Sequence, residues 1–394
     1  MRIILFIGKG GVGKSTNASA TAALSAACGK KTLLVSSDLA HNLLDILDVQ
    51  GEPGLVKLSE NLTILEVDIL SEIKENWDSV QQYLTDFFSY LKMDRMIAEE
   101  ISLIPGMDAI FLLTRILKEI ESGNWDVVII DCAPTAGTLR LLTLTDSSSN
   151  KFNQILKVER SLLKLIRPIG KQIKGVKQIL PEDELYVKFS RIIEDIGRLG
   201  DILRDPGQSS IRLVLNPDKI AIAESKRAFT YFALFGFPVD AVMVNKLLPR
   251  ELNSGYFQNW FQLQHEQMAV LEKSFINTRI LPITHYDQEP IGLARLEEMG
   301  RDVYKDLDPA GVLSEVNTVC FEKKDHHVIL SILIPNIDKS MLDIGRKDND
   351  LIISAGNYSR ILTLPDSLVN DDISKAEYKD DRLLLSFDKR GQPV

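Results

Sequence analysis

Residues 8–16 read GKGGVGKST and have the spacing of a phosphate-binding loop, G-x-x-x-x-G-K-[ST]. The apolar run Ile3–Ile7 precedes this stretch, and an alanine-rich helical pattern from Ser15 to Ala27 follows it. Backbone N–H groups of such a loop, together with the amino end of the helix, present unpaired donors that surround phosphate oxygens. The strand, loop and helix therefore predict nucleotide binding. The predicted nucleotide-binding residues are Gly8, Lys9, Gly10, Gly11, Val12, Gly13, Lys14, Ser15, Thr16 and Asn245.

Two lysines share this loop, although one phosphate-binding loop needs only one. Lys14 is expected to reach the β and γ phosphates, and the Ser15 hydroxyl is expected to ligate Mg²⁺. Lys9 stands directly behind the first glycine and has no such role within its own loop. From the residues alone, Lys9 is either a solvated loop lysine or a charge supplied to another phosphate.

Polar residues follow three of the apolar runs, where ligands of open parallel sheets bind. Asp38 follows the run Thr32–Ser36, and Asp131 follows the run Val127–Ile130. Asp131 is expected to approach the Mg²⁺ shell, in contact with the ion through water. Asn245 ends a further run and is a candidate partner for adenine. Each Asp alone also fits a helix cap, so the prediction of a site rests on their combination.

Composition limits the function classes. The 394 residues are 45% hydrophobic and 26% charged, as in ordinary globular proteins, and the length favours two or three domains. A net charge of −9 argues against a nucleic-acid partner. Cys28, Cys132 and Cys320 are too far apart for a disulfide framework or a metal-binding pair. No apolar run is long enough for a bilayer span, and no presequence is recognised, so a reduced cytoplasmic setting is expected.

Short β-branched runs alternate with longer helical patterns, which predicts an α/β fold with a doubly wound, mostly parallel sheet. Residues of about 68–120 and 150–206 are predicted to be helical insertions, and Lys151–Lys177 has the pattern of a basic amphipathic helix or pair of helices. The candidate strands are Ile3–Ile7, Thr32–Ser36, Leu62–Val67, Val127–Ile130, Arg212–Leu215, Ala241–Asn245 and Arg279–Ile283.

The pattern changes near residue 315, after which short alternating runs predict an all-β sandwich. The predicted domains are therefore 1–314 and 315–394. We expect the second to be an independent module, dispensable for ATP chemistry. Polar segments DIGRKDND, SAGN and EYKDD are interpreted as the turns between strands. The candidate strands are Val328–Ile334, Leu351–Ser354, Tyr358–Leu364 and Arg382–Phe387.

The first domain resembles the deviant-Walker-A ATPases of the arsenical-pump and guided-entry (tail-anchored protein targeting) type. The resemblance rests on GKGGVGKST, SSDLAHN (36–42), PGMDAIF (105–111) and DCAPTAGTLRLL (131–142), in that order. It implies a homodimer that hydrolyses ATP with Mg²⁺. It further implies that Lys9 reaches the partner's phosphates, that Asp38 orients the attacking water and that Asp131 heads the second switch. The implied partners are hydrophobic segments of client proteins, with a possible membrane receptor.

Several positions depart from that family. Leu39 stands where a proline is usual, and Ala136–Gly137 replace a usual Gly-His, so slower hydrolysis is expected. The paired cysteines of the zinc-bridged and metalloid-binding members are absent, so no structural zinc is expected between subunits. Two alternatives to the chaperone or targeting ATPase stay open: a transport-coupled anion or metalloid pump ATPase, and an ATP-locked holdase with little turnover.

Residues 320–387 resemble the α-crystallin domain of small heat-shock proteins, from ILIPNIDKSMLDIGRKDNDLIISAG through YSRILTLPDSLVNDDISKAEYKDDRLLLSF. The tail DKRGQPV lacks the I-x-I motif by which those proteins form large assemblies. Assembly is therefore expected to stop at the ATPase dimer.

Overall fold

The computed structural model describes residues 1–37, 43–51, 54–67, 107–133, 138–139, 142, 145, 183–275, 277–324, 327–369 and 371–388. Asp38, Leu39, Ala136–Gly137 and Lys151–Lys177 lie outside the described residues. The chain divides into two compact units. The first comprises Met1–Glu66, Asn124–Thr138 and Ile202–Val394, and the second comprises Val67–Gly123 and Leu139–Asp201.

The described part of the first unit contains an eight-stranded sheet with the order β3-β4-β2-β5-β1-β6-β7-β8. Only β3 runs antiparallel to its neighbour among these strands. The chain order reverses around β1, so the predicted doubly wound α/β fold is confirmed. The strands are β1 (Arg2–Ile7), β2 (Thr32–Ser36), β3 (Leu55–Lys57), β4 (Leu62–Glu66), β5 (Val127–Asp131), β6 (Ser209–Leu215), β7 (Val239–Leu247) and β8 (Arg279–Thr284).

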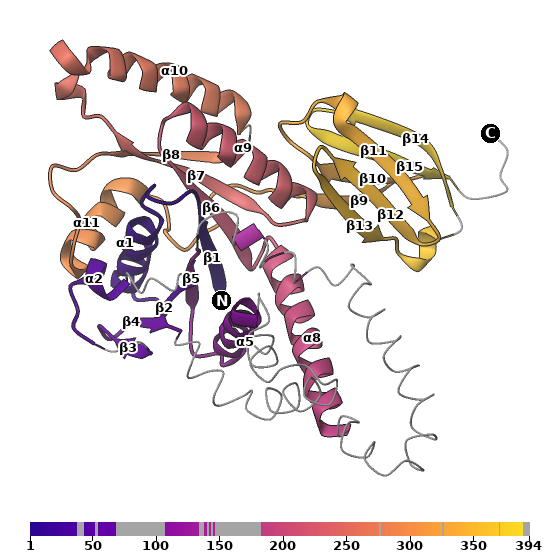
Figure 1. The fold of residues 1–394 in the computed structure, drawn as a ribbon, viewed down its shortest axis with the longest axis horizontal. Helices are drawn as coiled ribbons and strands as arrows, with labels where there is room; N and C mark the ends of the chain where they lie inside the picture. The colour runs from indigo at the N-terminus through magenta and orange to yellow at the C-terminus, as the bar shows by residue number, and fades with distance from the viewer. Residues whose placement is uncertain are drawn as a thin grey trace, which may run out of the picture. The chain divides into compact units, whose positions relative to one another are not determined.

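Helices lie against this sheet because its central strands are apolar on both faces (Figure 1). They are α1 (Lys14–Ala27), α9 (Lys219–Leu234) and α11 (Leu293–Tyr304). Helix α2 (Leu43–Leu47) contacts α1, and α10 (Gln258–Ser274) contacts α9 and follows the short 3₁₀ turns η2 (Arg250–Leu252) and η3 (Gly255–Phe257). Helices α1 and α11 pack closely at Gly300, where a Cβ atom would lie 2.7 Å from the carbonyl oxygen of Ala20. Only glycine fits that contact.

A buried hydrogen-bond network joins the same two helices to the sheet. Thr21 of α1 and Tyr304 of α11 share a hydrogen bond of 2.7 Å between their hydroxyl groups. The fully buried Arg212 of β6 donates to that Tyr304 hydroxyl at 2.8 Å. The Arg212 guanidinium also lies 3.5 Å from the carboxylate of Asp240 on β7, so the buried charge is paired.

The second unit contains α5 (Met107–Glu121) and most of α8 (Asp183–Arg204). Both fall within the predicted helical insertions, and in these ranges the prediction of helix is confirmed. Leu112, Leu113, Ile116, Leu117 and Ile120 of α5 are buried, and their spacing places them on one face of the helix.

The C-terminal part forms two antiparallel sheets among the described residues, with orders β14-β15-β10-β9 and β11-β12-β13. This confirms the predicted all-β region. Its strands are β9 (Val319–Lys324), β10 (His327–Leu333), β11 (Leu342–Lys347), β12 (Asp350–Ala355), β13 (Tyr358–Thr363), β14 (Asp372–Lys379) and β15 (Arg382–Asp388), with 3₁₀ turns η4 (Lys339–Met341) and η5 (Asp366–Leu368).

Two of the segments interpreted as turns are mostly strand, and that interpretation is wrong. DIGRK belongs to β11, and EYK belongs to β14. Strand β11 exposes alternate residues and most of β14 is exposed, so the polar and charged side chains of both strands resemble those of turns. The real turn after β14 is Asp380–Asp381, where both residues have positive φ, at 50° and 59°, as in a type I′ hairpin.

The β-sandwich contacts the end of α9 directly. Arg360 of β13 donates to the carbonyl oxygen of Leu234 at 2.7 Å. Thr230 of α9 donates to the carbonyl oxygen of Pro335 at 2.7 Å, and Thr318 donates to that of Gly236 at 3.1 Å. The sandwich is therefore held to the end of α9 by hydrogen bonds to backbone carbonyl groups on both sides.

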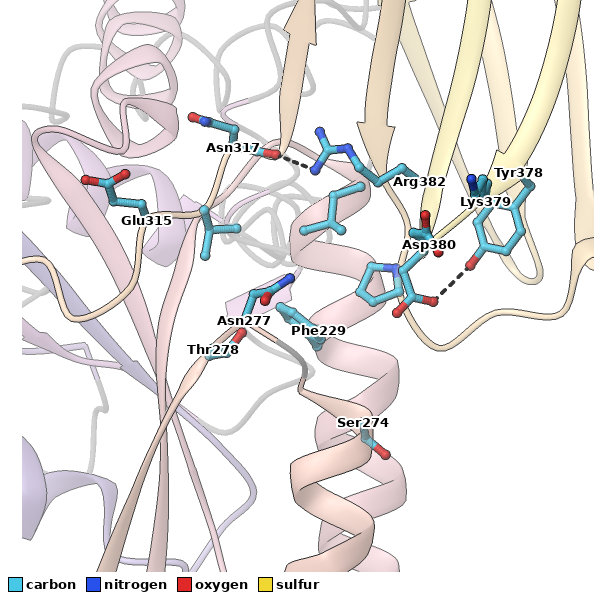
Figure 2. A pocket seen from close by; sticks show the side chains of 14 residues that line it. Phe229, Ser274, Asn277, Thr278, Glu315, Asn317, Tyr378, Lys379, Asp380 and Arg382 are labelled. Carbon is cyan, nitrogen blue, oxygen red and sulfur yellow. Dashed lines mark hydrogen bonds between the residues drawn. The ribbon is translucent and has the colours of Figure 1, made fainter.

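A cavity of about 560 Å³ lies beside these contacts (Figure 2). Arg382 crosses one side of it and donates to the carbonyl oxygen of Asn317 at 2.9 Å. On the other side, Tyr378 donates to the carboxylate of Asp381 at 3.3 Å. The walls come from α9, the segment after α10, the linker at 315–317 and the β14–β15 hairpin.

Candidate nucleotide-binding site

The loop of residues 8–13 joins β1 to α1, as predicted, and two of its glycines are required by close contacts. A Cβ atom on Gly8 would lie 2.1 Å from the carbonyl oxygen of Val214 in β6. Gly13 has φ +92°, and a Cβ atom there would lie 2.3 Å from the Asn245 side chain. The loop is therefore pressed against the ends of β6 and β7.

The amino end of α1 is open to an anion. Its N-cap is Gly13, no side chain caps the first turn, and that turn carries no acidic residue. The first N–H groups of a helix have no partner within the helix and carry a partial positive charge. Ser15 and Thr16 are half-buried in this turn, so a phosphate placed here would also meet their hydroxyl groups.

The two lysines of the loop have different environments. Lys14 is only 7% exposed, and its ammonium donates to the carbonyl oxygen of Lys9 at 3.2 Å. The Lys9 side chain is exposed, and among the described residues its ammonium makes no hydrogen bond or ion pair. Lys14 thus points back across its own loop, whereas Lys9 extends into solvent.

The end of β7 braces the loop. The Asn245 side-chain amide donates to the carbonyl oxygen of Val12 at 2.8 Å, and the Lys246 ammonium donates to that of Gly11 at 3.0 Å. The contact of Asn245 with adenine remains a prediction, since its amide already bonds the loop. Sequence reasoning missed Lys246, although its place at the carboxyl end of a strand was a usable signal.

A cavity of about 710 Å³ opens beside the loop. One wall is the phosphate-binding loop with the first turn of α1. The opposite wall is the segment 284–291 after β8, which includes Tyr286, Pro290 and Ile291. Sequence reasoning missed this segment too, because it carries no recognisable motif. Most of its residues are polar, but Tyr286, Pro290 and Ile291 supply aromatic and apolar surface suited to the face of a nucleobase.

Asp131 ends β5 beside the loop's strand. It is aligned with Phe6 of β1 and Ser36 of β2, and it is buried. The neighbouring Cys132 thiol has a raised pKa because it is fully buried and because Asp131 adds a negative charge. This thiol therefore stays protonated and is a poor metal ligand.

Ser37 connects the segments that begin at Asp38 and Asp131. Its backbone N–H donates to the carbonyl oxygen of Asp131 at 2.9 Å. Its hydroxyl accepts from the backbone N–H of Ala133 at 2.9 Å. Asp38 itself lies outside the described residues. The residues that are described fit a magnesium nucleotide, because the site offers a buried lysine, an open helix end, a serine hydroxyl and a buried carboxylate.

In the described part of the chain, no helix has the length and apolarity that crossing a membrane requires.

The chain is similar to known ATPases over nearly its whole length. Residues 1–305 match the family described as anion-transporting ATPase (ArsA_ATPase), and residues 325–387 match the HSP20-like domain found in ArsA. A putative arsenical pump-driving ATPase of Chlorobaculum tepidum is 35% identical over 100% of this chain and 98% of the relative. A putative arsenical pump-driving ATPase 1 of Aquifex aeolicus is 33% identical over 98% of this chain and 99% of the relative.

A more distant relative is the ATPase ASNA1 homolog 2 of Paramecium tetraurelia, which is 27% identical over 61% of this chain and 74% of the relative. The family matches agree with the parallel sheet and its loop in one part and with the antiparallel sheets in the other. The chain therefore belongs to the ArsA family of ATPases and carries the HSP20-like domain found in that family.

Proposed function

We propose that the chain acts as a homodimeric, Mg²⁺-dependent ATPase in which Lys9 of each subunit serves the nucleotide of the other. The observation that carries this proposal is the contrast between the two lysines. Lys14 is buried and donates within its own loop, whereas the Lys9 side chain extends into solvent at the same edge of the sheet. A charge that stabilises the transition state from a second subunit needs that exposure.

The remaining roles follow from the site. Lys14 and the open end of α1 would hold the phosphates. Ser15 would bind Mg²⁺ directly and Asp131 through water, and the ion would neutralise charge on the phosphates. The resemblance gives Asp38 the role of orienting the attacking water. The side chains of Tyr286 and Ile291 on the opposite wall would receive the base.

We further propose that the nucleotide cycle opens and closes a hydrophobic surface for client segments in chaperone or targeting work. The ASNA1-named relative favours this use. The alternative of a transport-coupled anion or metalloid pump is favoured by the names of the arsenical pump-driving relatives. Metalloid-stimulated turnover would support the pump. An ATP-locked holdase predicts tight ATP binding with little turnover.

Mixing two inactive variants tests the trans role. Lys9→Ala should lose turnover but keep most ATP binding, because a trans charge acts in the closed transition state, whereas Lys14→Ala should lose both. In an equal mixture, the heterodimer contains one intact site, formed by Lys14 of the first variant and Lys9 of the second. Turnover should then return to about a quarter of the wild-type rate, because half of the dimers are mixed and each has one working site of two.

A matched control is Lys246→Ala, which removes another exposed ammonium beside the loop. Mixing Lys246→Ala with Lys14→Ala should not restore turnover, because Lys246 contacts Gly11 of its own subunit and supplies nothing to the partner's site. If the Lys9→Ala and Lys14→Ala mixture stays inactive while heterodimers form, Lys9 acts in its own subunit and the proposal is wrong.

Client binding needs a separate measurement. Asp38→Asn protein held in ATP should retain its clients, and short hydrophobic segments among the co-purified polypeptides would support the targeting role. Their absence, together with metalloid-stimulated turnover of the wild type, would favour the pump.

A further inference from the structure

The cavity of about 560 Å³ beside α9 has walls from two parts of the chain (Figure 2). Asn277 and Thr278, in the turn between α10 and β8, line one side of it. Asp381 and Arg382 of the β14–β15 hairpin line the other side. Pockets for small molecules have volumes of about 300–1,000 Å³ and are frequent where two domains meet. The size and the place of this cavity therefore suit a small ligand.

A buried hydroxyl group in the wall of the cavity has no partner. Thr278 is only 9% exposed, and its hydroxyl forms no hydrogen bond with the described residues. The side-chain amide of its neighbour Asn277 forms none with them either. Most buried polar atoms of side chains do have a hydrogen-bond partner, either in the protein or in ordered water. This side of the cavity thus offers two polar groups to a molecule that fills it.

The hairpin side of the cavity offers two opposite charges. Tyr378 donates to one carboxylate oxygen of Asp381 at 3.3 Å, and the other oxygen accepts no hydrogen bond from the described side chains. The Arg382 guanidinium donates to the carbonyl oxygen of Asn317 at 2.9 Å and makes two further hydrogen bonds within the sandwich. A guanidinium has about five N–H donors, so some of those of Arg382 remain for a ligand.

These two charges do not neutralise each other. Asp381 and Arg382 are adjacent in the sequence, but no ion pair joins them, and neither pairs with another charged residue in the described part of the chain. Figure 2 shows the Arg382 side chain extending toward Asn317, whereas the Asp381 carboxylate turns toward Tyr378. A ligand with one anionic and one cationic group would pair with both, and hydrogen bonds between charged groups are the stronger ones.

The remaining walls are largely apolar. Phe229 of α9 lines the cavity together with Leu333 and Pro335. Figure 2 shows Phe229 between Thr278 on one side and Asp381 on the other. An apolar group of a ligand that contacts these walls would be removed from water, which favours binding.

We infer that this cavity binds a free α-amino acid with an apolar side chain. Arg382 would receive its carboxylate, and Asp381 would receive its ammonium group. An ammonium group has several N–H donors, so it would also donate to the Thr278 hydroxyl, which then gains a partner. Because the walls belong to the ATPase part and to the sandwich, the bound amino acid would add contacts between them. The contact of the sandwich with the ATPase part would therefore strengthen when the ligand is bound.

Ligand analogues test the two charge contacts. The full chain is melted with each standard amino acid at millimolar concentration, and those with apolar side chains should raise the melting temperature most. Calorimetric titration then compares the most stabilising amino acid with its decarboxylated amine and its deaminated acid. For L-leucine these are isoamylamine and isocaproate. Each analogue should bind about tenfold or more weakly, because it loses a hydrogen bond between charged groups.

Two variants test whether the ligand lies in this cavity. Asp381→Asn removes the charge, while asparagine suits the positive φ of 59° and still accepts from Tyr378. Thr278→Val removes a hydroxyl that has no partner among the described residues, so folding should be unaffected. Asp381→Asn should weaken binding of the amino acid about tenfold or more, and Thr278→Val about two- to tenfold. The matched control Asp348→Asn removes the same charge at another hairpin turn, with φ 54° and outside the cavity, and should leave the affinity unchanged.

Hydrogen–deuterium exchange provides a second measurement. The bound amino acid should slow exchange at 277–279 and at 378–382, on both sides of the cavity, and should not do so in Asp381→Asn. No rise in melting temperature with any standard amino acid would overturn the inference. Equal binding of the amino acid and both analogues, or undiminished binding by Asp381→Asn, would overturn it as well.

Discussion

Replacing Arg360 tests whether the β-sandwich stabilises the ATPase part of the chain. Arg360 is only 6% exposed, and it donates at 2.7 Å to the carbonyl oxygen of Leu234, the last residue of α9. Two residues further along the chain, Gly236 has φ +87°, and a Cβ atom on it would lie 3.4 Å from both terminal nitrogens of the Arg360 guanidinium. The positive charge of Arg360 also interacts favourably with the negative end of the helix dipole.

The loss in Arg360→Ala is expected to be about 2–3 kcal/mol, the range for a hydrogen bond from a charged donor to a buried carbonyl group. Arg204 donates to the adjacent carbonyl oxygen of Phe235 at 3.0 Å and remains in the variant, so the helix end keeps one cap. Because the sandwich and α9 are held by a few contacts, the loss should appear as local opening rather than as complete unfolding.

Hydrogen–deuterium exchange measures that opening. Amides of 230–237 and 358–363 should exchange about 30- to 150-fold faster in Arg360→Ala, as 1.4 kcal/mol corresponds to a factor of ten. The matched control is Arg346→Ala, since Arg346 donates to the carbonyl oxygen of Val369 at 2.6 Å inside the sandwich. It should loosen the sandwich but leave 230–237 protected. Unchanged exchange at 230–237 in Arg360→Ala would refute the argument.

Three further predictions concern the site and the sandwich. Gly8→Ala should abolish ATP binding in a calorimetric titration, because the new methyl group would lie 2.1 Å from the carbonyl oxygen of Val214, and retained affinity would show that the loop shifts freely. Ser37→Ala should lower kcat by about two- to tenfold with little change in KM, because it removes the 2.9 Å hydrogen bond from Ala133, and Ser37→Thr should restore the rate. Burial and a nearby carboxylate raise the pKa of Tyr378 to about 12, so the folded chain holds this proton more tightly than the unfolded chain does. Stability should therefore fall as pH rises above about 10, the ordinary tyrosine pKa, and Tyr378→Phe should show a smaller fall in melting temperature between pH 9 and 11.

Much of the fold was predictable because its signals are local. The runs around Ile3–Ile7 and Val127–Ile130 are apolar without interruption, as strands covered on both faces must be. The phosphate-binding loop has a fixed spacing that is readable without knowledge of the rest of the chain. The strands β11 and β14 were less predictable, because many of their residues face solvent and several of these are charged.

The opposite wall of the candidate site was not predictable from the sequence. Tyr286 and Ile291 meet the loop only because β8 lies two strands from β6 in the sheet, and that order is set by long-range pairing. The bracing contacts of Asn245 and Lys246 depend on the same pairing. The proposed domain boundary at 314/315 likewise remains a prediction, and the contacts through Arg360 were invisible in the sequence, because an arginine on a polar strand resembles a solvated one.

The close packing of α11 on α1 at Gly300 has a consequence for nucleotide affinity. With Ala20 against that glycine and Thr21 bonded to Tyr304, the two helices cannot slide past each other without breaking both contacts. Helix α1 begins at the end of the cavity proposed for the phosphates, and the segment leading into α11 forms the wall proposed for the base. A nucleotide would thus bind in a cavity whose two ends are already at a fixed separation, and the protein would lose little conformational entropy on binding. Free energy from binding would remain available to order other segments, so motion in the catalytic cycle is expected outside this helix pair.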